Sequence, residues 1–233
     1  MVLDIAKDAQ TGMTEFDYKP CQFIRSYNPY PDIQPGEIEE AARLINQSRK
    51  PFILAGQGVV ISHAEKELSE LAEKADIPVG CTLLGLSAIP TDHPLYKGML
   101  GMHGSIAANI KTNECDLLIA IGMRFDDRVT GDLKQYARQA KVIHIDIDPS
   151  EFNKNVKCDV SVLGDARAVL QKLNEKIAPA EHSEWIESFS VCEKVEKEKV
   201  IEPEIHPRKP LMNMGAVSYT HLRAHETCAE LVC

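Results

Sequence analysis

Short apolar runs alternate with amphipathic segments through the middle of this chain, and this alternation restricts the possible folds more than any other feature. The runs have strand length and lie at 51–56, 78–82, 116–121, 141–146 and 160–163. Segments of helical character lie between or beside them, at 36–45, 65–75, 105–112, 133–139 and 166–177. Strands and helices that alternate at these lengths predict a parallel sheet. We therefore expect an α/β fold, a doubly wound parallel sheet with helices on both faces.

The two ends of the chain differ from this central unit. Val2–Ile5 has the pattern of a strand that ends in the polar turn Ala6–Asp8, while a charged helix at 184–200 carries the only tryptophan, Trp185. Residues after about 216 show neither helical nor strand periodicity, and we interpret them as a non-native tail. The predicted division is the last strand of a truncated domain (1–10), a Pro-, Tyr- and Asn-rich linker (11–35), a compact domain (36–177), a helix and linker (178–216) and the tail (217–233).

Composition excludes several classes of partner. The formal net charge of −9 argues against nucleic acid and against an anionic membrane surface. The sequence has no apolar run near the roughly 20 residues that span a bilayer, and its start lacks the basic and apolar regions of a signal peptide. The seven cysteines show no paired spacing, which is typical of a reduced compartment. We expect a cytoplasmic protein that binds neither nucleic acid nor membrane.

The segment Gly122–Gly131 directly follows the apolar run Leu117–Ile121 and places two arginines and two aspartates within five residues. In a doubly wound sheet, ligands bind where central strands end at their carboxyl side. The alternative is a solvated loop whose charges pair with one another.

Further candidate residues follow the other predicted strands, at Gly56–Gly58, Thr82–Leu83, Asp146–Ile147 and Gly164–Asp165. Glycines let a ligand approach the backbone closely, and acids after strands can accept hydrogen bonds from ribose hydroxyls, although such acids also serve as helix caps. Gly101–Gly104 precedes a predicted helix whose free N–H groups would favour a phosphate, and Arg124 can add a bidentate contact. Together these features predict a dinucleotide lying across the sheet edge.

The histidines give no catalytic constellation. His144 alternates with Ile143 and Ile145 in a predicted strand and is interpreted as a satisfied core or interface histidine, while His103 lies in a glycine-rich loop and is placed to contact a ligand. His221, His225 and Cys228 have the spacing of metal ligands, but they lie in the tail, so no metal site is expected. Because no nucleophile–base pair is found, the sequence predicts that the sheet edge binds a ligand and carries out no catalysis.

Three segments, Leu100–Gly104, Gly122–Gly131 and His144–Asp148, resemble the large catalytic subunit of acetolactate synthase (acetohydroxyacid synthase). The resemblance runs from Val2 to about Asn174. In that family the chain consists of a pyrimidine-binding, a central FAD-binding and a pyrophosphate-binding domain. The resemblance implies that residues 36–177 have the fold of the central domain of thiamine diphosphate enzymes.

The resemblance also implies roles for individual residues. Positions that match FAD contacts are Gln57, Thr82, Leu83, Leu100, Gly101, Met102, His103, Gly122, Met123, Arg124, Phe125, Asp126, Asp146, Ile147, Asp165 and Ala166. Gln57 stands where relatives often have glycine, a change that a backbone contact would survive. Arg128 matches an arginine at the active-site entrance that helps to recognise the 2-keto-acid acceptor. Asp127 and Lys7 match positions that line the same channel.

For the whole enzyme, the resemblance implies condensation of two pyruvates, or of pyruvate and 2-ketobutyrate, in branched-chain amino-acid biosynthesis. It implies thiamine diphosphate and Mg²⁺ as cofactors, a mainly structural FAD, a homo-oligomer and a small regulatory subunit. The family's catalytic glutamate and metal-binding motif have no match in this sequence, nor has an FAD-binding arginine expected just before Val2, so we expect the chain alone to bind FAD at most. Two alternatives remain, namely another FAD-bearing thiamine enzyme such as glyoxylate carboligase, which the Arg124–Arg128 segment disfavours, and a stand-alone nucleotide-binding module.

Overall fold

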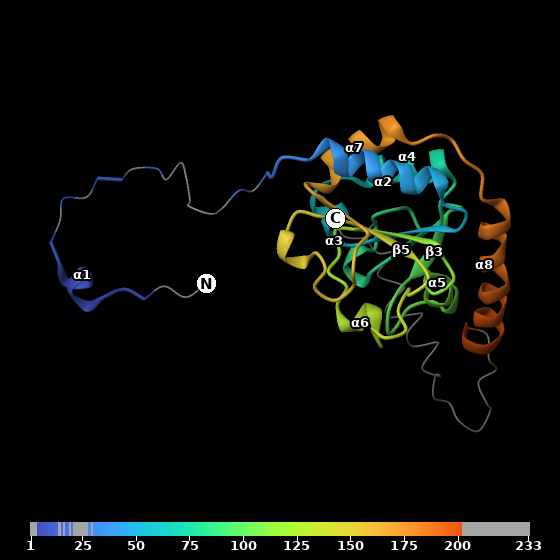
Figure 1. Ribbon diagram of the computed structural model, residues 1–233. Helices are drawn as coiled ribbons and strands as arrows, with labels where there is room; N and C mark the ends of the chain where they lie inside the picture. Colours follow the sequence, from blue (N-terminus) through green and yellow to red (C-terminus); the bar gives the residue numbers. More distant parts are fainter. Residues whose placement is uncertain are drawn as a thin grey trace, which may run out of the picture.

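The computed structural model describes residues 4–13, 15, 17, 18, 20, 28 and 30–201 of the chain (Figure 1). The tail at 217–233, with its His221, His225 and Cys228, lies outside the described residues. An α/β body contains almost all the regular structure, and the short helix α1 (Lys7–Thr11) lies apart from it in Figure 1.

Six strands form one sheet in the order β3-β2-β1-β4-β5-β6, and every neighbouring pair is parallel. The strands are β1 (Pro51–Ala55), β2 (Val79–Cys81), β3 (Tyr96–Met99), β4 (Leu117–Ile121), β5 (Lys141–Asp146) and β6 (Val160–Leu163). β1 and β4 are fully buried, as their uninterrupted apolar sequences predict. The strand order reverses between β1 and β4, so the predicted doubly wound sheet is confirmed and its topological switch point lies there.

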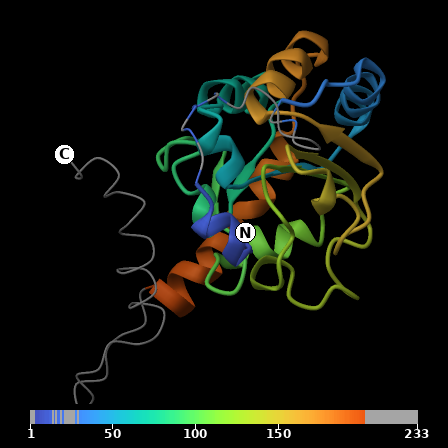
Figure 2. The same ribbon diagram turned by 90° about the vertical axis from the view of Figure 1, so that its left-hand side faces the viewer.

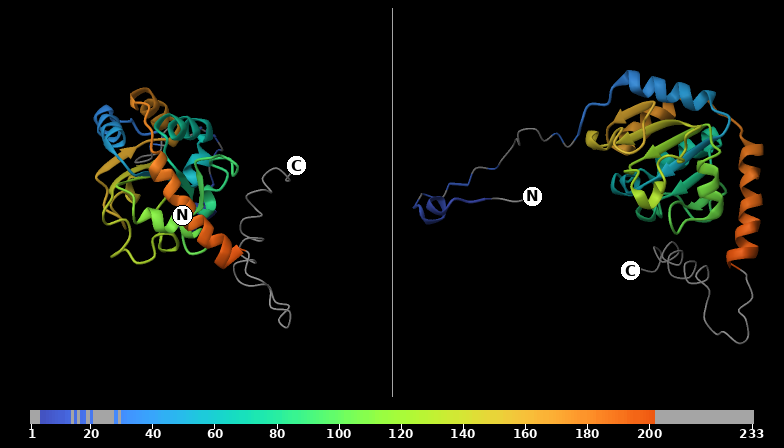
Figure 3. Two further views of the ribbon diagram at one scale, coloured as in Figure 1. Left: turned by 90° about the vertical axis from the view of Figure 1, so that its right-hand side faces the viewer. Right: turned by 60° about the horizontal axis from the view of Figure 1, so that its bottom comes forward.

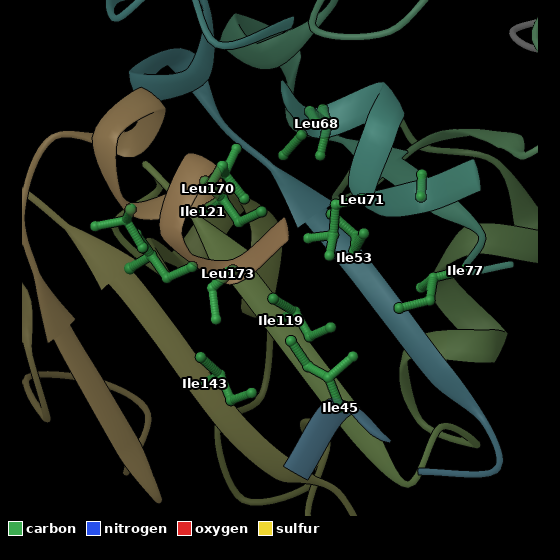
Figure 4. Close-up of a cluster of buried hydrophobic side chains, with 14 of the residues drawn as sticks. Ile45, Ile53, Leu68, Leu71, Ile77, Ile119, Ile121, Ile143, Leu170 and Leu173 are labelled. Carbon is green, nitrogen blue, oxygen red and sulfur yellow. The ribbon is translucent and has the colours of Figure 1, made fainter. Parts of the chain in front are cut away.

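Three amphipathic helices cover one face of the sheet, α2 (Pro35–Gln47), α4 (Glu65–Ala75) and α7 (Ala166–Lys176). They lie together in Figure 2 as the blue, teal and orange helices. Their apolar stripes pack on the alternate strand residues that point to this face (Figure 4). Ile53, Ile119 and Ile143 lie at the centre of this core and have no exposed surface.

The opposite face is covered by α5 (Ile106–Thr112) and the long helix α8 (Ser183–Glu196), which runs along the side of the body in Figure 3. The Phe189 ring of α8 lies 5.5 Å from the Phe52 ring of β1 and 5.1 Å from that of Trp185. Trp185 Nε1 donates a hydrogen bond of 2.8 Å to the Pro51 carbonyl. The predicted charged helix therefore completes the second core, and it continues into a π-helical turn, η3 (Lys197–Ile201).

Short helical turns begin where four of the strands end. These are α3 (Gln57–Ile61), η1 (Leu83–Gly85), α6 (Asp127–Thr130) and η2 (Pro149–Glu151). Asp148 caps η2 by accepting a hydrogen bond from Ser150 N–H, and Pro149 stands at the first helical position.

Three expectations about secondary structure are wrong. Asp4 and Ile5 lie in no strand, and helix α1 starts at Lys7, where a turn was expected; among the described residues this segment has no sheet to pair with. The predicted helix at 133–139 is a series of turns, because Ala137 adopts a positive φ of 48° that a right-handed helix excludes. No strand was expected between residues 82 and 116, but β3 lies there, and its first three residues are only partly buried.

Two further findings concern the described residues only. No helix in them is long and apolar enough to cross a membrane. Cys81, Cys115, Cys158 and Cys192, which lie in this part of the chain, are free thiols.

Candidate functional site: a cavity at the sheet's carboxyl edge

Two glycine loops meet at the switch point of the sheet. Gly58 N–H, after β1, donates a hydrogen bond of 3.0 Å to the Gly122 carbonyl, after β4. A Cβ on Gly58 would lie 2.6 Å from Gly122 Cα, closer than such atoms approach. Gly122 also has a positive φ of 60°, which glycine adopts without strain. The two backbones therefore touch directly, and both line the cavity described next.

A cavity of about 560 Å³ opens above this contact, at the carboxyl edge of the sheet. The volume lies within the range of small-molecule and cofactor sites, roughly 300–1,000 Å³. Residues after β1, β2, β3, β4, β5 and β6 all contribute to its wall, so it crosses the switch point, where doubly wound sheets bind ligands.

Most of the residues predicted from the resemblance line this one cavity. They are Gln57, Thr82, Leu83, Leu100, Met102, His103, Gly122, Met123, Arg124, Asp126, Asp146, Ile147, Asp165 and Ala166. Gly101 and Phe125 do not line it. Of the predicted substrate-channel residues, Arg128 lines the cavity, whereas Asp127 and Lys7 do not, and Lys7 lies in the separate helix α1. That these residues contact FAD or substrate remains a prediction.

Gly101 and Phe125 support the wall from behind. Gly101 has a φ of 103°, and Asn109 bonds both its N–H and its carbonyl at 3.0 Å. Phe125 is 2% exposed, and its ring packs edge-on against those of His144 and Tyr136. Both residues fix the course of loops whose neighbours face the cavity.

The arginines of the charged loop are only loosely paired. Arg124 Nη2 lies 3.8 Å from Asp126 Oδ2, and Arg128 Nε lies 3.8 Å from Asp127 Oδ1. Their side chains are 68% and 72% exposed, so such pairs contribute little to stability. The loop charges therefore do pair with one another, as the alternative interpretation holds. These pairs are long and exposed, so both guanidinium groups can still bind an anion.

The acids at the ends of β5 and β6 both make a local hydrogen bond and face the cavity. Asp146 Oδ1 accepts a hydrogen bond of 2.9 Å from Asp148 N–H, and burial raises the pKa of this carboxyl. Asp165 Oδ1 accepts one of 3.2 Å from Ala168 N–H and caps α7. The helix-cap alternative is therefore correct for Asp165, and both acids nevertheless face the cavity.

His144 is a core histidine, as predicted. Its side chain is completely buried, Nε2 lies 2.8 Å from the Met123 carbonyl oxygen, and burial lowers its pKa. His103, by contrast, is exposed and lines the cavity.

The interpretation of the helix after Gly101–Gly104 as a phosphate site is wrong for α5. Its N-cap Ser105 accepts a hydrogen bond from Ala108 N–H, and Ile106 N–H donates to a Glu196 carboxylate oxygen at 3.1 Å. Neither Ser105 nor Ile106 lines the cavity. Side chains of the protein already accept hydrogen bonds from two of the first N–H groups of this helix, so the cavity takes its positive charge from the loop after β4.

Several lining residues were absent from the candidates that the sequence offered: Ile61, Ser62, Leu84, Met99 and Ile145. Gly58, Val129 and Gly164 also line the cavity and lie in predicted segments, although the resemblance did not match them to FAD contacts. Ile61 follows Gln57 on α3 at a spacing of four residues, and Ser62, which ends the helix, follows Gly58 at the same spacing, so all four lie on one side of it. Recognising α3 would have identified them, but a glycine at its second position conceals the helix. The described residues contain no group of three or more His, Cys, Asp or Glu side chains that could hold a metal ion.

The family model of the central domain of thiamine pyrophosphate enzymes matches residues 38–173 of the chain. The chain therefore belongs to the thiamine pyrophosphate enzymes, and the match covers the sheet and the cavity. Within that family it is 46% identical to the probable acetolactate synthase large subunit of Methanocaldococcus jannaschii over 199 residues, 83% of this chain and 34% of that protein. It is 43% identical over 192 residues to the acetolactate synthase large subunit of Corynebacterium glutamicum, covering 80% and 31%.

The protein of the same name from Buchnera aphidicola is 39% identical over 201 residues, 84% of this chain and 35% of that relative. The chain thus spans about a third of the length of the curated relatives it matches. These comparisons confirm the resemblance recognised in the sequence.

Proposed function

We propose that the chain is part of an acetolactate synthase large subunit and that its central domain binds FAD across the carboxyl edge of the sheet. The observation that carries this proposal is the single cavity at the β1–β4 switch point, because it is lined by all but two of the residues that the resemblance assigns to FAD.

The chemistry of the cavity wall suits a flavin dinucleotide. Arg124 offers a guanidinium group for the diphosphate, and the carboxylates of Asp146 and Asp165 can accept hydrogen bonds from ribose hydroxyls. Apolar side chains, among them Leu83 and Met102, supply the kind of surface that an aromatic ring system covers. The backbones of Gly58 and Gly122 touch, so a Cβ on either residue would clash with the other loop.

The two arginines of the loop take different partners in this proposal. Arg124 belongs to the FAD site, while Arg128, which also lines the cavity, binds the carboxylate of the 2-keto-acid acceptor. Arg128 N–H is held by Asp126 Oδ1 at 3.1 Å, at the start of α6, which separates its position from that of Arg124. A strongly exposed guanidinium is suited to meeting an anionic substrate from solvent.

In the complete enzyme, we propose the condensation of two 2-keto acids to a 2-acetohydroxy acid in the cytoplasm, by a homo-oligomer with a small regulatory subunit. Thiamine diphosphate with Mg²⁺ supplies the carbanion chemistry when bound there. The residues of this chain bind FAD, orient the keto-acid carboxylate and keep that part of the channel ordered.

Flavin-fluorescence titration of the 233-residue chain tests this division. Arg124→Ala should weaken FAD binding by about one to two decades, since a charge-assisted contact contributes roughly 1.5–3 kcal/mol. Arg128 is an equally exposed arginine of the same loop, and Arg128→Ala should leave FAD affinity within about twofold of the wild-type value. If Arg128→Ala weakened FAD more than Arg124→Ala, the assignment of the two arginines would be wrong.

The sheet order is also that of NAD-binding domains, so NAD⁺ should be titrated in parallel. Binding of NAD⁺ without binding of FAD would support a nucleotide-binding module of another kind.

A further inference from the structure

Two side chains that do not line the cavity hold the peptide carbonyls on either side of Arg124. The imidazole Nε2 of His144, in β5, lies 2.8 Å from the Met123 carbonyl oxygen. The amide Nδ2 of Asn155 donates a hydrogen bond of 2.9 Å to the Phe125 carbonyl. Arg124 therefore stands between two anchored peptide groups, one fixed from the sheet and one from the loop after η2.

The backbone between these anchors is bent in a way that its sequence does not favour. Phe125 has a φ of 50°, in the left-handed region that non-glycine residues rarely adopt. Its ring turns into the core, 5.0 Å from the ring of His144, while Arg124 turns outward to the cavity. Such a conformation persists only where the surroundings determine it. Here the surroundings are the His144 ring, which contacts both the carbonyl before Arg124 and the side chain after it, and the Asn155 amide.

The protonation state of His144 follows from its partners. A carbonyl oxygen only accepts, so Nε2 carries the proton, and Nδ1 faces the Cys158 thiol at 3.7 Å. Burial lowers the pKa of His144 by more than the nearby Asp146 and Glu151 carboxylates raise it. The neutral ring is therefore the favoured form at neutral pH. The single Nε2–H is thus committed to the Met123 carbonyl, with Asp146 Oδ2 at 3.8 Å as the next acceptor.

We infer that His144 and Asn155 are positioning residues of the cofactor site, which fix the direction of Arg124 through the carbonyls of Met123 and Phe125. This inference rests on the proposed function in naming FAD as the ligand. It assigns a role to two residues that neither face the cavity nor touch the ligand. The kinked loop is then already in its binding conformation before FAD arrives, which reduces the ordering cost of binding.

Asn155→Asp is the first variant, because it replaces the amide donor by an acceptor of the same shape at a residue whose surface is largely exposed. FAD affinity should fall about five- to tenfold, the loss expected for one hydrogen bond. The matched control is Asn46→Asp, since Asn46 also donates to a backbone carbonyl, that of Lys176 at 3.3 Å, but lies near the C-terminal end of α2 and does not line the cavity. It should leave FAD affinity unchanged.

His144 is tested by a pair of substitutions. His144→Leu removes the donor and should weaken FAD about tenfold or more, whereas His144→Gln keeps an N–H at similar reach and should restore most of the affinity. Val142→Ala, on the same strand and face, lowers core packing without touching either carbonyl. It should reduce the melting temperature and leave FAD affinity unchanged, which separates positioning from general destabilisation.

A double-mutant cycle isolates the route through Arg124. In an Arg124→Ala background, Asn155→Asp should cause no further loss of FAD affinity, because the group that it positions is absent. Full additivity of the two losses would overturn the inference.

Hydrogen exchange of the segment 122–131 in the unliganded protein provides a readout that does not involve FAD. Asn155→Asp and His144→Leu should accelerate exchange in this segment, while Asn46→Asp should not. Unchanged exchange would overturn the inference whether or not FAD binds. Faster exchange in a protein whose wild type fails to bind FAD would support the positioning role and contradict the proposed function.

Discussion

At the scale of single residues, the cavity depends on backbones that approach one another more closely than a side chain permits. Gly58 and Gly122 bring the ends of β1 and β4 into contact, and Gly101 packs a positive-φ turn against the Arg128 carbonyl. Each glycine is thus required by a specific neighbour and not by general flexibility.

Gly58→Ala should therefore be damaging. The new methyl would meet Gly122 Cα at 2.6 Å, and forced repacking of this kind costs about 1–3 kcal/mol. Urea denaturation should show this decrease in the free energy of unfolding, and the variant should also lose FAD binding. Gly36→Ala is the control, because a Cβ at Gly36 meets no atom within 4 Å; it should keep FAD affinity and leave the free energy of unfolding unchanged or slightly raised. Equal stability of the two variants would contradict the contact.

The buried His144 predicts a pH dependence of stability. Burial lowers its pKa in the folded state from the usual 6.5, so below about pH 6.5 the unfolded chain binds a proton that the folded chain does not. The free energy of unfolding should therefore be highest above that pH and should fall as the pH is lowered toward the folded-state pKa.

Urea denaturation at pH 7.5 and at pH 5.5 measures the difference in the free energy of unfolding between the two pH values. His144→Gln should lose part of this difference, whereas His103→Gln, a substitution at an exposed histidine, should keep it. Asp146 contributes to the free energy of unfolding with the opposite pH dependence, because burial raises the pKa of its carboxyl above the usual 3.8. A wild-type pH dependence in His144→Gln would contradict the prediction.

At the scale of elements, α8 supplies the apolar cover for the second face of the sheet. Phe189 is completely buried between Phe52 and Trp185, and deleting such a ring costs about 3–5 kcal/mol. Phe189→Ala should lower the free energy of unfolding by that amount in urea. Val191→Ala on the same helix, at a side chain 66% exposed, should stay within about 0.5 kcal/mol of wild type. A small effect of Phe189→Ala would show that α8 is not part of the cooperative core.

The sequence predicts elements well where one physical signal dominates. β1 and β4 are continuous apolar runs, and α2, α4 and α7 have clear apolar stripes. β3 escapes because it is an edge strand with partly buried residues and a positive-φ glycine, Gly98. The segment 133–139 has helix-forming residues, but the left-handed Ala137 and the burial of Tyr136 against Phe125 override that propensity.

For the site, most lining positions follow from the resemblance and from the rule that parallel strands end at one edge. Tertiary contacts decide the rest. Nothing local in the sequence shows that Glu196 occupies the start of α5, or that His144 and Asn155 reach the carbonyls beside Arg124.

At the scale of the whole molecule, we expect the 233-residue chain to form no acetolactate from pyruvate in the presence of thiamine diphosphate, Mg²⁺ and FAD. The resemblance places the residues that hold and activate thiamine diphosphate in segments that this sequence does not match, and positioning groups cannot replace that cofactor. A colorimetric acetolactate assay, with a full-length relative as positive control, measures this. Turnover by the chain alone would mean that the domain assignment is wrong.

The wall of the cavity is drawn from turns spread between Gln57 and Ala166, one after each strand. No single segment retains a binding surface once the sheet is disrupted, so affinity for FAD and cooperative unfolding are thermodynamically linked. At a free FAD concentration a hundredfold above its Kd, this linkage would add about 2.7 kcal/mol to the free energy of unfolding, a rise in Tm of about 5–11 °C for a domain of this size. FAD takes part in no reaction on this chain, yet its binding would then determine the temperature up to which the sheet remains folded.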